Sequence, residues 1–303
     1  MLRVARFLIA PLLLVAITLT VLVLTSRPAQ TPKVLTSLGD QPLVIAHRGG
    51  RGLWPENSLF AFQRASALGV DMLEMDVRLS SDGQIVVIHD ATVDRTTNGE
   101  GPVDSFTLEQ LQQLDAGYNW TADGGQSYPY RNQSITIPQF EAVLQAEPTI
   151  AKVIELKLAG NELVDKLCQS LNDYKQRDRV VIASYYESSL QRLREHCPGI
   201  ATSASPNSIR LFLAMNWLGI SSALSPSYQV VQIPPRHSGV ELASSALITS
   251  AKARGLSVQL WTINEQPAMR KLLDVGAQGL ITDYPDRALQ LLGRSTRISA
   301  LSD

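Results

Sequence analysis

Short apolar runs alternate with amphipathic stretches from Leu43 almost to the end of the chain. The runs predict strands at Leu43–Ala46, Met72–Leu79, Gln84–His89, Lys152–Lys157, Val180–Ser184, Ala201–Ala204, Ala223–Pro226, Ser257–Thr262 and Gly279–Thr282. Helical periodicity predicts helices at Asn57–Leu68, Pro138–Ala146, Glu162–Tyr174, Glu187–His196, Ser208–Leu218, Val240–Arg254, Gln266–Val275 and Asp286–Leu292. Repeated strand–helix units favour an α/β fold with a parallel sheet, and their number fits a (β/α)8 TIM barrel. An open doubly wound sheet is the alternative, but no glycine-rich dinucleotide loop follows the first strand.

Two features depart from this alternation. The strands Met72–Leu79 and Gln84–His89 form either one long strand broken by a turn or a local hairpin. The stretch 91–137 has no strand–helix unit and contains one helix-like piece, Leu108–Leu114, which Thr107 can cap. Because an unstructured loop of that length is uncommon inside a compact domain, we predict a small inserted subdomain after the second strand, over one end of the barrel.

The chain begins with an apolar segment. Residues Phe7–Leu24 carry no charge, a length that just allows a helix to cross the hydrocarbon core of a bilayer. The segment is either a cleaved signal peptide or an uncleaved signal anchor, and its length favours an N-terminal transmembrane helix. The positive-inside rule places Arg3 and Arg6 in the cytoplasm. The domain that follows is therefore expected to be extracytoplasmic, in a periplasm or lumen, or secreted if the segment is cleaved.

These observations divide the chain into four predicted parts: a membrane anchor or signal segment at 1–25, a stem at 26–41, the barrel domain at 42–295 including the insertion, and a C-terminal tail at 296–303. Charge is balanced, with 27 Lys and Arg against 28 Asp and Glu among 303 residues, which argues against a nucleic-acid partner. Two cysteines exclude a disulfide scaffold and a Cys-rich zinc site. Cys168 and Cys197 form either one disulfide or two unlinked thiols.

Glu74 and Asp76 stand two residues apart on a strand that is otherwise apolar, so both side chains point to the same face. Two carboxylates side by side in the barrel interior would repel each other and lose solvation. One divalent cation resolves that conflict, and ligands that are all oxygen select Mg²⁺ or Ca²⁺. Glu155, from a later strand, can supply a third carboxylate. The alternative is an exposed acidic pair on an edge strand.

Basic and titratable residues follow the same strands. His47 and Arg48 come directly after the first strand, and His89 ends the Gln84–His89 run. Lys157 stands two residues after Glu155, on the same face. The carboxyl ends of barrel strands meet at one rim, where active sites lie. Two cations and a metal there would bind an anion, and two histidines would supply a general acid and a general base.

Taken together in this order and spacing, the motifs resemble the glycerophosphodiester phosphodiesterase family from Leu43 to Leu292. They are His47-Arg48-Gly49, Pro55-Glu56-Asn57, Glu74-x-Asp76, Asp82-Gly83, His89-Asp90, Thr96-Thr97-Asn98-Gly99, Glu155-x-Lys157, Trp261-Thr262-x-Asn264 and Thr282-Asp283-x-Pro285. The resemblance implies that Glu74, Asp76 and Glu155 bind the divalent cation. It further implies that His47 and His89 are the acid/base pair, that Arg48 and Lys157 bind the substrate phosphate, and that Trp261 lines the substrate pocket. A core position for Trp261 is the alternative. Glu56 and Asn57 would shape the first loop of the barrel, and Asp283 would orient a neighbour.

The activity implied by the resemblance is metal-dependent hydrolysis of glycerophosphodiesters to sn-glycerol 3-phosphate and an alcohol, as part of phospholipid and glycerol metabolism. One alternative is lysophospholipase D-type hydrolysis of lysophospholipids on the same barrel. A second, from another class, is a non-catalytic, membrane-tethered binding barrel. The expected partners are a small-molecule glycerophosphodiester or lysophospholipid and a membrane, the latter through the N-terminal helix.

Overall fold

Eight parallel strands form a nearly closed barrel. The computed structural model describes residues 2–294, with backbone only for residues 2–12 and 15, so the predicted tail at 296–303 lies outside the described residues. The strand order is β6-β5-β4-β2-β1-β11-β10-β7, with bounds β1 Leu43–Ala46, β2 Met72–Leu79, β4 Ala151–Leu156, β5 Val180–Ser184, β6 Ala201–Thr202, β7 Val230–Ile233, β10 Ser257–Leu260 and β11 Gly279–Thr282. A parallel bridge between Ser203 and Val230 joins the two ends of this order. The prediction of a (β/α)8 barrel is confirmed.

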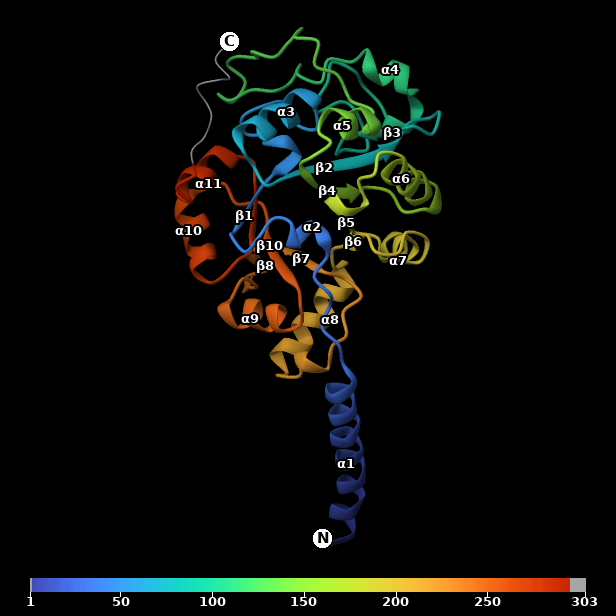
Figure 1. Ribbon diagram of the computed structural model, residues 1–303, viewed down its shortest axis with the longest axis vertical. Helices are drawn as coiled ribbons and strands as arrows, with labels where there is room; N and C mark the ends of the chain where they lie inside the picture. The colour runs from blue at the N-terminus through green and yellow to red at the C-terminus, as the bar shows by residue number, and fades with distance from the viewer. Residues whose placement is uncertain (1, 295–303) are drawn as a thin grey trace.

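Helices surround the strands, as Figure 1 shows. They are α3 Leu59–Leu68, α5 Phe140–Ala146, α6 Asn161–Asp173, α7 Glu187–His196, α8 Pro206–Trp217, α9 Ser245–Ala253, α10 Gln266–Asp274 and α11 Pro285–Leu291. Most barrel strands are buried along their whole length, because helices cover one face and the barrel interior covers the other. This explains why the sequence reads as short continuous apolar runs instead of alternating ones.

The amino end of the barrel is closed by a short helix, α2 (Lys33–Thr36). Its Val34 is 2% exposed and belongs to the apolar cluster inside the barrel, with Leu43, Ile45 and Ile281. The opposite, carboxyl end of the strands is therefore the end that is free to form a site.

The predicted strand Ala223–Pro226 is wrong. No strand forms at Ala223–Pro226, where residues 221–223 make a 3-10 turn, η4 (Ser221–Ala223), and the seventh barrel strand is Val230–Ile233. The proline at position 226 has no N–H for a ladder, whereas Val230–Ile233 pairs in full with β10.

The predicted helix Val240–Arg254 begins too early. Strands β8 (Arg236–His237) and β9 (Val240–Glu241) form a small hairpin there. The helix starts at Ser245, because the Ser244 hydroxyl caps it by accepting the Leu247 N–H.

The first helix also starts later than predicted, at Leu59. Asn57 has a φ of +54°, a left-handed conformation that cannot continue a helix, and the hydroxyl of Ser58 accepts the Ala61 N–H as the cap. The residues just before this helix are thereby freed to turn toward the barrel rim.

The insertion after the second strand has its own small core. β3 (Ile85–Val87) pairs antiparallel with β2, so the local hairpin is the correct alternative. The 3-10 turn η2 (Val103–Ser105) and helix α4 (Leu108–Gln112) follow, and Thr107 caps α4 in a capping box, as its sequence predicts. Val103 of η2 and Leu111 of α4 pack in one apolar cluster with Val86 of β3. The domain boundaries themselves stay predictions.

Helix α1 (Leu2–Thr25) extends away from the barrel beyond α8, as Figure 1 shows. At its base, the Ser26 hydroxyl donates to the Ser222 carbonyl at 2.6 Å. Within the part of the chain whose side chains are described, no helix is long and apolar enough to span a membrane. The predicted span Phe7–Leu24 falls partly on side chains outside that part.

Cys168 on α6 and Cys197 after α7 are joined by a disulfide, with their Cα atoms 6.2 Å apart. The sequence alone left this pairing open. The bond links two neighbouring helices of the outer layer.

If Val34 closes the barrel, replacing it with Ala should reduce the free energy of unfolding by about 2 kcal/mol, because two buried carbon groups are lost and a small cavity remains. Chemical denaturation monitored by circular dichroism measures this. The matched control is Thr36→Ala on the same helix, whose exposed side chain should matter little. Equal losses for both variants would contradict the closing role of Val34.

Candidate active site

The predicted site residues meet at the carboxyl end of the barrel. In the β2–β4 register, Asp76 lies beside Glu155, and in the β1–β2 register Ala46 lies beside Leu73, which brings the residues after β1 next to Glu74. A cavity of about 390 Å³ opens here, and its lining includes His47, Arg48, Glu74, His89, Glu155, Lys157 and Trp261. Asp76 is only 1% exposed and lies beneath the cavity floor. Trp261 is 42% exposed, so it is not a core residue.

Three carboxylates form a compact cluster. One oxygen from each of Glu74, Asp76 and Glu155 lies within 4.8 Å of the others. Asp76 Oδ1 is buried and accepts no hydrogen bond from a described residue, although the Lys157 ammonium lies 3.1 Å away. Burial, together with the negative charge of Asp76, raises the pKa of Glu74 to about 7. The donor set and the poorly compensated charge fit a hard divalent cation.

Fixed cations compensate only part of this cluster. The Lys157 ammonium contacts Glu155 Oε2 at 2.8 Å as well as Asp76. The Arg48 guanidinium lies 3.3 Å from Asp76 Oδ2 on the other side. Although burial alone would raise it, the pKa of Asp76 is lowered by Lys157 and Arg48. Asp76 therefore stays ionised, and Glu74 is the carboxylate of the cluster that no side-chain cation of the described residues contacts.

The first loop of the barrel supports Asp76 and Arg48. The side chain of Asn57 donates to Asp76 Oδ2 at 2.9 Å and accepts the Asp76 N–H at 3.2 Å. The Arg48 N–H donates to Glu74 Oε2 at 2.7 Å. Gly49 follows with a φ of +83°, and a Cβ there would lie 2.8 Å from the Ala61 side chain. Only glycine fits, so the turn that aims Arg48 depends on it.

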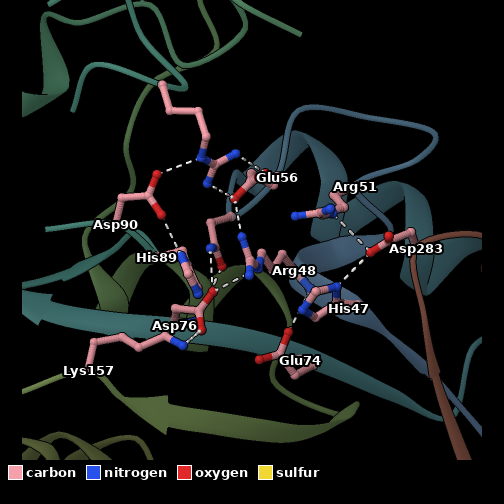
Figure 2. Close-up of polar contacts among 12 residues, drawn as sticks. His47, Arg48, Arg51, Glu56, Glu74, Asp76, His89, Asp90, Lys157 and Asp283 are labelled. Carbon is pink, nitrogen blue, oxygen red and sulfur yellow. Dashed lines mark hydrogen bonds and ion pairs between the residues drawn. The ribbon is translucent and has the colours of Figure 1, made fainter. Parts of the chain in front are cut away.

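His47 is oriented by a carboxylate. Its Nδ1 lies 2.6 Å from Asp283 Oδ1, as Figure 2 shows. Asp283 in turn accepts from the Asn264 amide at 2.8 Å and lies 3.1 Å from Arg51 Nε. Burial opposes ionisation, but the hydrogen bond from His47 lowers the pKa of Asp283. An ionised Asp283 fixes the proton on Nδ1 and leaves Nε2 for chemistry.

His89 is oriented in the same way. Its Nδ1 lies 2.5 Å from Asp90 Oδ1. Burial lowers the pKa of His89, against the raising effects of Asp76 and Asp90. The Arg78 guanidinium donates to the His89 carbonyl at 2.9 Å and holds the strand end in place. Two histidines, one after β1 and one after β3, thus line one cavity, each held by its own carboxylate.

Arg95 of the insertion also belongs to this arrangement, because its Nε donates to Asp90 Oδ2 at 2.5 Å. Neither residue was assigned a role from the sequence. Asp90 is adjacent to His89, and Arg95 directly precedes Thr96-Thr97-Asn98-Gly99. Adjacency to a candidate histidine and to a motif were the available signals. The contacts of Arg95 depend on how the insertion folds back, which no local pattern reveals.

The raised pKa of Glu74 has a measurable consequence. A folded-state pKa of about 7 against an ordinary 4.5 means that the stabilising contribution of Glu74 is lost as pH rises through about 7. In the presence of a chelator, the melting temperature of the wild type should therefore fall more than that of Glu74→Gln as the pH rises from 4.5 to about 7. Each kcal/mol of stability lost should lower the melting temperature by about 2–4 °C. Differential scanning fluorimetry measures this.

Adding Mg²⁺ or Ca²⁺ above pH 7 should then raise the melting temperature of the wild type and much less that of Glu74→Gln. Glu162→Gln, an exposed position on α6, is the control and should behave as wild type. Parallel pH profiles for the wild type and Glu74→Gln would contradict the electrostatic account of the cluster.

Comparison with known proteins agrees with this geometry. The model of the glycerophosphoryl diester phosphodiesterase family matches residues 47–287. The protein YhdW of Bacillus subtilis is 38% identical over 246 residues, covering 80% of this chain and 95% of its own length. The glycerophosphodiester phosphodiesterase of Caldanaerobacter subterraneus is 31% identical over 264 residues, covering 82% of this chain and 97% of its own.

A solved structure is similar over the same region. It is a phosphodiesterase of Oleispira antarctica in complex with the product sn-glycerol-3-phosphate, with a TM-score of 0.68 and 27% identity, covering 84% of this chain and 97% of that one. The family match begins at His47 and ends after Asp283, so it includes both histidines, their carboxylates and the acidic cluster. The chain therefore belongs to the glycerophosphoryl diester phosphodiesterase family and is a phosphoric diester hydrolase.

Proposed function

We propose that this enzyme hydrolyses glycerophosphodiesters to sn-glycerol 3-phosphate and a free alcohol. The observation that carries the proposal is the pair of carboxylate-held histidines, His47 and His89, lining one cavity with an acidic cluster and two cations. The product in the Oleispira antarctica structure supports the same substrate class.

The cofactor we propose is one divalent cation, Mg²⁺ or Ca²⁺, bound by Glu74, Asp76 and Glu155. Two observations indicate that these residues fit such an ion. Their donor atoms are all oxygen, and the buried Asp76 Oδ1 accepts no hydrogen bond from a described residue. When bound, such an ion would draw negative charge from a phosphoryl oxygen and make the phosphorus easier to attack.

Arg48 and Lys157 are the proposed phosphate-binding side chains. Both line the cavity, and Lys157 is 14% exposed, enough to reach a ligand while it remains paired with Asp76. The pKa of Lys157 is raised by Asp76 and Glu155 despite its burial, so the ammonium stays charged at neutral pH. Their positive charges would orient the phosphodiester and offset the charge that develops during the reaction.

The two histidines would transfer protons to and from the substrate and the nucleophile through their Nε2 atoms. One, as neutral base, would accept a proton from the nucleophile. Water as the nucleophile gives sn-glycerol 3-phosphate directly, whereas the free glycerol hydroxyl next to the phosphate gives a cyclic phosphodiester, which a second attack, by water, opens to the same product. The other histidine, as imidazolium, would donate its proton to the oxygen of the leaving alcohol as the P–O bond breaks. Asp283 and Asp90 would keep the Nδ1 protons in place through both steps.

For localisation, we propose a single-pass N-terminal anchor with the catalytic domain outside the cytoplasm. The uncharged run at Phe7–Leu24 supports it. Among the described side chains of α1, seven large apolar ones are exposed, and a contiguous exposed apolar surface is typical of a site of membrane or protein contact. They are Leu13, Leu14, Ile17, Val21, Leu22, Val23 and Leu24. The Cys168–Cys197 disulfide also fits an oxidising compartment outside the cytoplasm.

The function is tested by measuring glycerol 3-phosphate and choline release from glycerophosphocholine, with lysophosphatidylcholine as the competing substrate. We expect turnover of the first, loss of activity in EDTA and recovery on adding Mg²⁺ or Ca²⁺. His47→Ala and His89→Ala should each reduce kcat by ~10²–10⁴, the usual contribution of one acid/base group.

His196→Ala, at an exposed position on α7, is the matched control and should retain full activity. Preferred cleavage of lysophosphatidylcholine would favour the lysophospholipase D alternative. Full activity of both histidine variants would refute the acid/base assignment, and activity that EDTA leaves unchanged would refute the cation.

The localisation is tested by expressing the full chain and a variant lacking residues 1–25 with the same tag. The full chain should sediment with membranes and resist carbonate extraction, while the shortened chain should not. External protease should reach the domain in spheroplasts. Recovery of the full chain in the soluble fraction would contradict the anchor.

A further inference from the structure

Arg95, in the insertion, lies outside the substrate cavity. It lines a separate, neighbouring cavity of about 260 Å³, together with Glu56, Arg51 and Trp120. Its side chain is 46% exposed, and none of its contacts is with a group that would touch the substrate phosphate. The position of Arg95 therefore argues against a role in substrate binding.

Its guanidinium instead bridges two carboxylates. Nε donates to Asp90 Oδ2 at 2.5 Å. The two terminal nitrogens donate to the two oxygens of Glu56, both at 2.8 Å. This uses the planar fork of arginine on two partners at once, which a lysine ammonium cannot reproduce.

Each of those carboxylates supports a different part of the site, as Figure 2 shows. The other oxygen of Asp90 holds Nδ1 of His89. Glu56 Oε1 also accepts from the Arg48 guanidinium at 2.8 Å. A single side chain from the insertion therefore connects the support of a histidine to the support of a phosphate-binding arginine.

The electrostatics agree with a supporting role. Burial alone would raise the pKa of Glu56, but its bonds to Arg95 and Arg48 lower it to about 2. Asp90 behaves in the same way, with Arg95 and His89 lowering its pKa to about 2. Both carboxylates are ionised across the working pH range, and without a cation between them they would repel.

We propose that Arg95 is a positioning residue that couples His89 to Arg48 through Asp90 and Glu56. The inference rests on the proposed roles of His89 and Arg48. It assigns the insertion a task in the reaction: the folded insertion fixes the geometry of the acid/base group and of the phosphate-binding cation together. Loss of Arg95 would free Asp90 to turn away from His89 and would leave Glu56 paired with Arg48 alone.

The test compares Arg95→Ala, Arg95→Lys and wild type by steady-state kinetics on the full chain. Arg95→Ala should lower kcat roughly 10–100-fold, as expected for a residue that orients a reacting group. KM should change less than about threefold, because the substrate cavity keeps its lining. Arg95→Lys should recover only part of kcat, since one ammonium pairs with one carboxylate.

Added guanidinium ion at millimolar concentration should restore part of the kcat of Arg95→Ala, because the neighbouring cavity is open to solvent. Urea, of similar shape but neutral, should not. The matched control is Arg192→Ala, which breaks a comparable two-point Arg–Asp contact with Asp165 on the outer helices and should leave kcat unchanged.

Several results would overturn the inference. A kcat for Arg95→Ala within twofold of wild type would show that the bridge is not needed. An increase in KM at unchanged kcat would indicate contact with substrate. A fall in kcat that follows the melting temperature, with no rescue by guanidinium, would indicate a purely structural role. If His89→Ala and Arg48→Ala were themselves fully active, the proposed function would fail instead.

Discussion

Burial of carboxylates on β2 is the constraint on which this site is built. Glu74 and Asp76 are 5% and 1% exposed, and ionised groups at that depth are destabilising unless they are compensated. The chain supplies Arg48 from the loop after β1 and Lys157 from the end of β4. Asn57 completes the shell of Asp76 through two hydrogen bonds. Two other barrel segments, the loop after β1 and the end of β4, thus supply the groups that compensate these carboxylates.

The histidines, like the buried carboxylates, are held by charged groups from other segments. His47 follows β1 and His89 follows β3, yet each has an ionised carboxylate on Nδ1. Those carboxylates are fixed by arginines that lie outside the acidic cluster. Layers of opposite charge therefore extend outward from the cavity, and each layer fixes the orientation of the one inside it.

The sequence was sufficient to predict the site residues that follow from strand periodicity and from the order of parallel strands. The spacing of Glu74 and Asp76 gave their common face, and parallel strands brought Glu155 to them. It failed at Ala223–Pro226, where a proline-containing run was mistaken for β7, because strand pairing with β10 selects Val230–Ile233. It also missed Arg95, whose partners Glu56 and Asp90 come together only after the insertion folds over the rim.

The charge balance at the cavity explains why a divalent ion suits this cluster better than a monovalent one. Among the described residues, two side-chain cations, Arg48 and Lys157, contact the cluster of three carboxylates, and Arg48 is shared with Glu56. The cluster therefore keeps an excess of negative charge, which together with burial raises the pKa of Glu74. A phosphodiester brings one more negative charge when it enters. Arg48 and Lys157 cannot neutralise it fully, since both are already paired with Asp76. A divalent cation compensates more of this negative charge than a monovalent one, which supports Mg²⁺ or Ca²⁺ as the proposed cofactor.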